Sequence, residues 1–95
     1  KDAKTFTPLT QGLREHLSFP TSLTTDSRGG LYAVDENGAG VVLLGQDGSF
    51  LGRQLAMGWK EGLLYYPSQM CVNQRDEAFI ADRGNSRVQV FAIVR

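Results

Sequence analysis

The sequence predicts an all-β protein made of two four-stranded antiparallel units. Three observations predict this fold. The chain has 95 residues, which is enough for one small domain. Short apolar or alternating runs are separated by polar turns rich in glycine, a pattern typical of strands. The same pattern recurs along the chain, which indicates a repeated structural unit.

The repeat becomes visible when the chain is shifted by 47 residues, because the second copy then aligns without a gap. Asp35 falls on Asp82, and LYAVDENG falls on AFIADRGN. Exact identities are few, but apolar positions fall on apolar positions. We therefore expect a single segment over 1–95, with a first repeat at 18–64 and a second at 65–95.

Each repeat predicts strands in the same order. In the first repeat, a short alternating run around Leu23 precedes apolar runs at 31–34 and 41–44. The turn GQDGS follows, and its Asp-Gly pair suits a hairpin because glycine takes a positive φ without strain. A fourth strand then starts at Phe50. The second repeat offers three corresponding runs, around Met70 and Val72, at 78–81 and at 88–91.

Four short antiparallel strands in a period of about 40 to 50 residues are typical of a β-propeller blade. Residues 3–9, AKTFTPL, are then expected to be the outer strand of a preceding blade. In KEGLLYYPSQM, Gly62 and Pro67 limit any helix. We therefore expect a loop there and no long helix in the chain.

The second repeat resembles the NHL repeat, a family of β-propeller blades. The segment IADRGNSRVQVF at 80–91 matches the family's D-x-x-N-x-R-V-Q-V-F signature. The first repeat is degenerate, since it has Gly38 and Gly40 where the second has Asn85 and Arg87. The resemblance covers about residues 18–95 and implies NHL-type propeller blades.

The turn from Asp82 to Arg87 is predicted to be structural. An Asp at a turn accepts backbone N–H bonds, and Asn85 or a glycine can take the left-handed position. Arg87 can reach back to Asp82 as a charge-assisted pair. The alternative, an active-site Asp–Arg pair, would need a nucleophile, base or metal converging on a substrate, and the turn shows none. Asp35 is expected to fill the same structural place in the first repeat.

The residues that most often carry catalysis or bind metal are scarce. A zinc site needs about four nitrogen or sulfur ligands, whereas His16 and Cys71 are the single histidine and cysteine. We predict no metal, no cofactor and no enzymatic activity. Some enzymes are similar to this family, among them the amidating lyases. They use a metal and a set of histidine side chains, and this chain has neither set. Cys71 lies in an apolar stretch and is predicted to be buried.

Two blades cannot close a ring, because propellers generally need four to eight. Their apolar faces would remain in water, and patches of that kind indicate an interface. The chain is therefore expected either to be part of a longer propeller or to assemble with copies of itself. Three copies would complete six blades in a closed cyclic arrangement.

Function is expected to reside in loop surfaces. Ten Lys and Arg balance ten Asp and Glu, which disfavours a nucleic-acid binder. We predict a scaffold that binds a protein partner; RNA binding on the same face, as in the NHL domains of ubiquitin ligases, is the alternative. A third interpretation is a purely structural part of a larger propeller. No apolar stretch is long enough for a membrane span, and the low cysteine content favours the cytoplasm. The expected contact residues are Arg28, Arg53, Trp59, Lys60 and Arg83.

Overall fold

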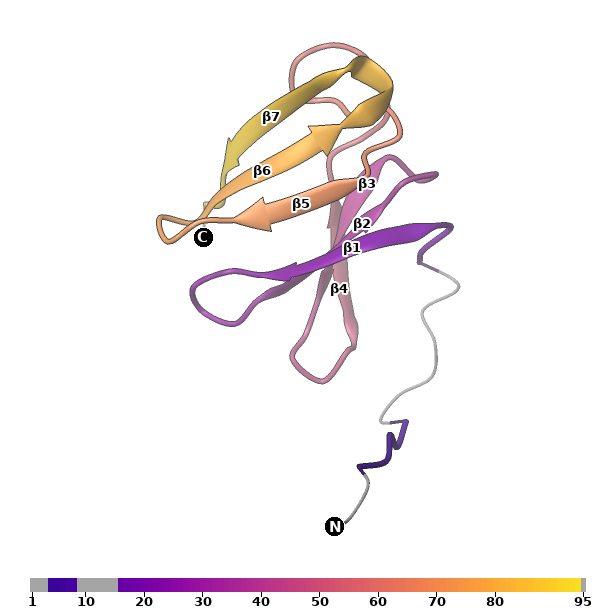
Figure 1. Ribbon diagram of the computed structural model, residues 1–95, viewed down its shortest axis with the longest axis vertical. Helices are drawn as coiled ribbons and strands as arrows, with labels where there is room; N and C mark the ends of the chain where they lie inside the picture. The colour runs from indigo at the N-terminus through magenta and orange to yellow at the C-terminus, as the bar shows by residue number, and fades with distance from the viewer. Residues whose placement is uncertain (1–3, 9–15, 95) are drawn as a thin grey trace.

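The computed structural model describes residues 4–8 and 16–94, and within them it is all-β (Figure 1). Two antiparallel sheets follow one another along the chain. Sheet 1 has the order β1-β2-β3-β4, and sheet 2 has the order β5-β6-β7. The strands are β1 (Pro20–Thr25), β2 (Leu31–Asp35), β3 (Gly40–Leu44), β4 (Phe50–Gln54), β5 (Gln69–Val72), β6 (Glu77–Asp82) and β7 (Arg87–Ala92), with a 3-10 turn η1 (Arg83–Asn85) between the last two. The predicted all-β, blade-like fold is confirmed, but in the described residues sheet 2 has three strands and not the four predicted for each unit.

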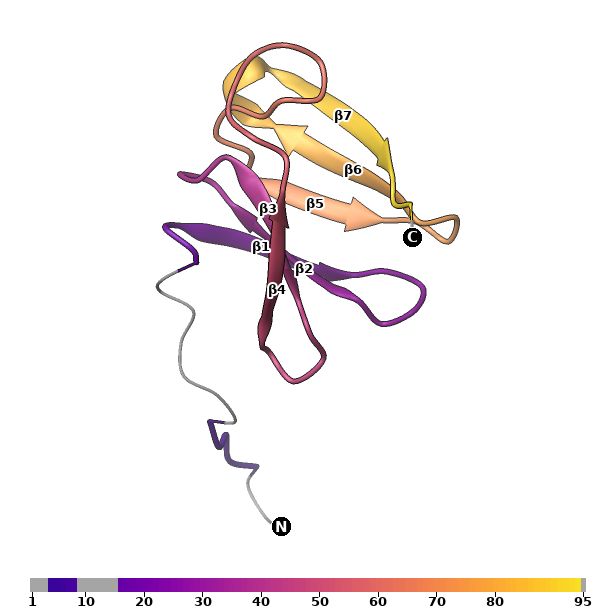
Figure 2. The same ribbon diagram turned by 180° about the vertical axis from the view of Figure 1, so that it is seen from behind.

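The two sheets pack against each other with β1 beside β5, as both views show (Figures 1 and 2). Ser22 Oγ accepts a hydrogen bond of 3.3 Å from the Met70 N–H and so joins these two strands. Farther along, the Ser27 N–H and Oγ donate to the Asp76 carboxylate at 2.9 and 2.7 Å. Polar contacts therefore tie the two sheets together at their inner strands.

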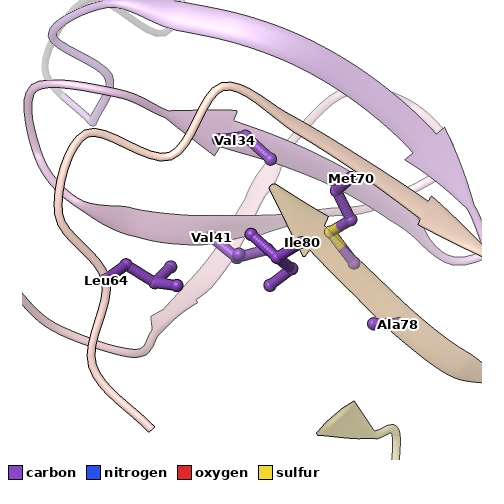
Figure 3. Close-up of a cluster of buried hydrophobic side chains, with 6 residues drawn as sticks. All are labelled: Val34, Val41, Leu64, Met70, Ala78 and Ile80. Carbon is purple, nitrogen blue, oxygen red and sulfur yellow. The ribbon is translucent and has the colours of Figure 1, made fainter. Parts of the chain in front are cut away.

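The core lies between the sheets (Figure 3). It forms because side chains alternate across a strand, so every second apolar residue faces the neighbouring sheet. Leu64, from the loop that joins the sheets, closes the cluster. Fully burying one such aliphatic side chain stabilises the fold by about 1.5–3 kcal/mol. The buried members are Val34, Val41, Leu64, Met70, Ala78 and Ile80.

The 47-residue shift found in the sequence also relates hydrogen bonds. In the turn between β1 and β2, Asp26 Oδ1 accepts from the backbone N–H groups two and four residues later, at 2.9 and 2.8 Å. Asn73 Oδ1 makes the same two bonds between β5 and β6, at 2.9 and 3.0 Å. Gly29 in the first turn has a φ of 83°, and Asp76 in the second has a φ of 57°. The two sheets therefore share turn geometry as well as strand order.

Residues 4–8 form no strand, while residues 3 and 9 lie outside the described residues. Figure 1 shows 4–8 away from both sheets. A strand needs a sheet edge beside it to complete its hydrogen bonds, and neither sheet provides one there. The outer strand expected at 3–9 stays a prediction for a state in which a neighbouring blade is present.

The expectation of a buried Cys71 is wrong, since its side chain is exposed. Cys71 lies on β5, between the core residue Met70 and the half-buried Val72. Alternation along the strand therefore turns Cys71 to the other face of sheet 2, against which neither sheet packs. In the described part of the chain, no helix has the length and apolar character to cross a membrane.

Candidate interaction surface

The carboxylate of Asp82 is the centre of a hydrogen-bond network at the end of β6. Its side chain is fully buried. Oδ1 accepts from the Tyr65 N–H at 2.6 Å. Oδ2 accepts from Asn85 Nδ2 at 2.8 Å, from Arg87 Nε at 2.9 Å and from Gln89 Nε2 at 3.1 Å. The expected pair of Asp82 and Arg87 is therefore present, and both carboxylate oxygens are used within the fold.

This network keeps Asp82 ionised. Burial alone would raise the pKa of the carboxyl, because a charge is poorly solvated in a protein interior. The bonds from Asn85, Tyr65, Arg87 and Gln89 outweigh burial and hold the pKa below its ordinary value of 3.8. A carboxylate with these partners fixes the turn rather than acting as a proton acceptor for a substrate.

The left-handed residue of the turn is neither Asn85 nor a glycine. It is Ser86, with a φ of 55°, and its N–H donates to the Arg83 carbonyl at 3.1 Å. Asn85 instead lies in the 3-10 turn η1, where its Nδ2 also donates to the Gly58 carbonyl at 3.0 Å. The signature asparagine therefore links the turn to the loop between the sheets.

The loop between β4 and β5 is fixed by side chains of the same network. Arg87 Nη2 donates to the carbonyls of Lys60 and Leu63 at 2.9 and 3.0 Å. Gln89 Nε2 donates to the Leu63 carbonyl at 2.7 Å, and its Oε1 accepts from the Gly62 N–H at 2.9 Å. Trp59 lies within this loop and is 74% exposed. A rigid support thus presents a large aromatic side chain to solvent.

Arg83 belongs to the same end of the molecule, in the turn between β6 and β7. It forms an ion pair with Glu36, whose side chain is only 10% exposed and which directly follows β2. Residues 36–39, 56–66 and 83–86 therefore meet at one end of the sheets, which we call the Trp59 end.

Residues 64–91 match the family model described as NHL repeat. This segment is consistent with the NHL-repeat family. The match covers β5, β6 and all of β7 except Ala92, with the Asp82 turn and its hydrogen-bond network. An NHL repeat indicates a β-propeller interaction module. No curated protein matches the chain. Residues 18–63 lie outside the match, so the other NHL repeat expected at 18–64 stays a prediction.

Sheet 1 repeats the central feature of the NHL repeat with a different arginine. Asp35 is fully buried and accepts from the N–H groups of Ser18 and Phe19, at 3.1 and 2.8 Å. Arg53 Nη2 donates to Asp35 Oδ2 at 2.8 Å. Burial raises the pKa of Asp35. The hydrogen bonds from its partners lower the pKa by more than burial raises it, so the pKa lies below 3.8. Gly40 occupies the position of Arg87 in the NHL repeat, and the arginine comes from β4 instead.

The predicted contact residues do not share one surface. Trp59, Lys60 and Arg83 lie at the Trp59 end, and all three are exposed, although Arg83 is paired with Glu36. Arg53 points to that end but is occupied by Asp35. Arg28 is exposed in the turn between β1 and β2, which lies at the opposite end of the antiparallel strands. This division follows from the antiparallel strand order, because consecutive turns lie at opposite ends of a sheet.

The Trp59 end also carries two aromatic side chains that precede the buried Pro67. Tyr65 and Tyr66 are 40% and 39% exposed, and their rings meet edge to face with centroids 4.7 Å apart. The Gly84 N–H donates to the Tyr65 carbonyl at 2.7 Å and so fixes the pair against the turn. Exposed aromatics on a fixed backbone are typical of protein-binding surfaces.

Two residues that shape this end were missed in the sequence. Gln89 could have been found, because it alternates with Arg87 and so faces the same side of β7. Glu36 carries no such signal, since its ion pair with Arg83 joins two repeats.

Among the described residues, no group of three metal-ligating side chains is present. His16 stacks on Phe50, with centroids 3.7 Å apart.

Proposed function

We propose that the chain is a non-enzymatic interaction module whose blades form part of a propeller and whose Trp59 end binds a protein partner. The propeller is completed either by self-assembly or by further blades of a longer chain. The observation that carries the proposal is the exposure of Trp59 on a loop whose carbonyls at 58, 60 and 63 accept side-chain hydrogen bonds. A large aromatic side chain on a fixed loop backbone requires little ordering of the loop on binding.

Charge favours a protein partner over RNA at this end. RNA binding draws its affinity from cations that contact phosphates. Three arginines at the Trp59 end are already paired with carboxylates: Arg53 with Asp35, Arg83 with Glu36, and Arg87 with Asp82. Breaking these pairs to reach a phosphate would leave carboxylates without their partners. Two of those carboxylates are fully buried, so that loss would be costly.

The test compares Trp59→Ala with Arg28→Ala, which removes an exposed side chain at the opposite end. Proteins captured on the wild-type chain after nuclease treatment are purified, and their binding is measured directly by calorimetry. Trp59→Ala is expected to weaken binding by about 30-fold, the effect of losing about 2 kcal/mol at a tryptophan hot spot. Arg28→Ala is expected to leave affinity unchanged.

The RNA alternative is tested in parallel with single-stranded RNA of mixed sequence. Protein recognition predicts affinity that depends little on salt. RNA recognition predicts affinity that falls steeply with salt and is lost when Lys60 and Arg83 are both changed to alanine. Tight, salt-sensitive RNA binding, or a protein partner that is indifferent to Trp59→Ala, would overturn the proposal.

A further inference from the structure

Each sheet keeps one face that no other sheet covers in a single chain. On sheet 2 this open face carries Val88 and Val90, which are 63% and 56% exposed, and the exposed Cys71. On sheet 1 the open face carries Leu23, which is 66% exposed. Ala33, Val42 and Leu44 on the same face are buried, with Leu17 packed against them. Apolar surface of this kind indicates that something binds there.

The open face of sheet 2 repeats the packed face of sheet 1. The 47-residue shift places Val88 on Val41 and Val90 on Leu43. Val41 is a buried core residue between the sheets, and Leu43 packs against that core. Residues of the same type, at the same register positions, are therefore covered on one sheet and exposed on the other.

The open face of sheet 1 likewise repeats the packed face of sheet 2. Leu23 corresponds to Met70, and Leu17 corresponds to Leu64. Met70 and Leu64 both belong to the buried cluster between the sheets. Within one chain, the packed face of sheet 1 contacts the packed face of sheet 2. The 47-residue shift relates the first of these to the open face of sheet 2 and the second to the open face of sheet 1.

We propose that the open face of sheet 2 binds the open face of sheet 1 of a second copy of this chain. The occupant is a second copy because the contact already made inside the chain shows how these two kinds of face fit. The inference rests on the part of the proposed function that treats each sheet as a propeller blade. A head-to-tail contact of this kind closes into a ring when its rotation allows, and three copies supply six sheets.

The contact between copies is mainly apolar. Within the chain, Ser27 and Asp76 join the sheets through two hydrogen bonds. The same shift places Ser27 on Gln74, and it relates Asp76 to Gly29, so that polar link has no equivalent across the new interface.

The first experiment measures solution mass by light scattering over a range of concentrations. The wild-type chain is expected to reach three times the 10.4 kDa of one chain. Val88→Lys and Leu23→Lys each block one open face and are expected to reduce the mass to one chain. Both side chains are mostly exposed in the single chain, so circular dichroism should show both variants folded. Trp59→Lys removes a larger exposed apolar side chain at the end of the sheets and should leave the trimer intact.

Mixing the two blocked variants gives the decisive result. The intact sheet 2 face of Leu23→Lys can still bind the intact sheet 1 face of Val88→Lys, so a mass of two chains is expected. Cys71 gives a second readout, because its thiol should react more slowly with Ellman's reagent in the wild-type assembly than in either variant. A wild-type monomer at every concentration, or a mixture that stays monomeric, would overturn the inference. A chain that stays monomeric but binds a partner through Trp59 would contradict only this inference. A chain that assembles but shows no Trp59-dependent binding would contradict only the proposed partner site.

Discussion

Arg53 lies 2.8 Å from Asp35 although β3 separates their strands in the sheet. In the NHL repeat of sheet 2, the corresponding ion pair joins the adjacent strands β6 and β7, with Arg87 at 2.9 Å from Asp82. Sheet 1 has therefore kept the buried carboxylate while drawing its arginine from a different strand.

Replacing Arg53 tests this relationship. Arg53→Ala removes a hydrogen bond to a buried charge and is expected to lower the free energy of unfolding by about 2 kcal/mol. Urea unfolding followed by circular dichroism measures the loss. Arg75→Ala, an exposed arginine in the turn between β5 and β6, is the control and should change stability by less than about 0.5 kcal/mol. An equal effect of the two substitutions would contradict a structural role for Arg53.

Gly40 explains how the exchange is accommodated. A Cβ at this position would lie 2.9 Å from Arg53 Nη1 and 3.1 Å from the Gln54 carbonyl oxygen. Gly40→Arg is therefore expected to destabilise the wild-type chain. Gly40→Arg should lower the free energy of unfolding by less in the Arg53→Ala background. There the clash with the Arg53 side chain is gone, and the new guanidinium can approach Asp35. A double-mutant cycle by urea unfolding measures the difference; strictly additive costs would show that the two positions are independent.

Asp82 should affect both stability and the conformation of the Trp59 loop. Asp82→Ala leaves four donors without their acceptor in a fully buried site. The expected loss is about 3–5 kcal/mol, a large part of the stability of a small domain. Trp59 is the only tryptophan, so its emission anisotropy reports on the loop and should fall. Asp47→Ala, in an exposed hairpin turn, should leave Trp59 anisotropy unchanged.

Acid should unfold the protein through the two buried carboxylates. The folded-state pKa values of Asp35 and Asp82 both lie below 3.8, so the folded state binds protons more weakly than the unfolded chain. Their contribution is present above the unfolded pKa and is lost as the pH falls through the folded values. Unfolding free energy should be level above about pH 5 and decline below about pH 4. In Asp82→Asn the decline should be shallower; an identical acid slope would show that Asp82 does not contribute.

The two equivalent turns should respond differently to substitution. Gly29→Ala places a Cβ on a residue with a φ of 83° and is expected to cost about 1 kcal/mol. Asp76→Gly relieves a φ of 57° but removes both hydrogen bonds from Ser27. The loss of the link between the sheets should outweigh the relief, so thermal unfolding is expected to occur at a lower temperature. A higher melting temperature for Asp76→Gly would show that backbone strain dominates in that turn.

The positions of the strands could be predicted from local pattern alone. Alternation of apolar residues set the runs around Leu23, at 31–34 and at 78–81, and the Asp47-Gly48 pair marked a hairpin that the structure contains, with Gly48 at a φ of 87°. The reach of Arg87 to Asp82 was also predictable, because both residues flank one short turn. Such features depend on neighbours in sequence, which a single chain displays directly.

The exposure of Cys71 and the pairing of Arg53 with Asp35 were decided by tertiary structure. Each depends on which sheet face is covered or on contacts between residues far apart in sequence. An apolar residue on a strand looks the same whether or not another sheet packs on it. What the sequence determined by itself was the repeated strand unit and its turns, because backbone preference and alternation act locally. What only the packing of the two sheets decided was which of the four faces pack against each other and which do not.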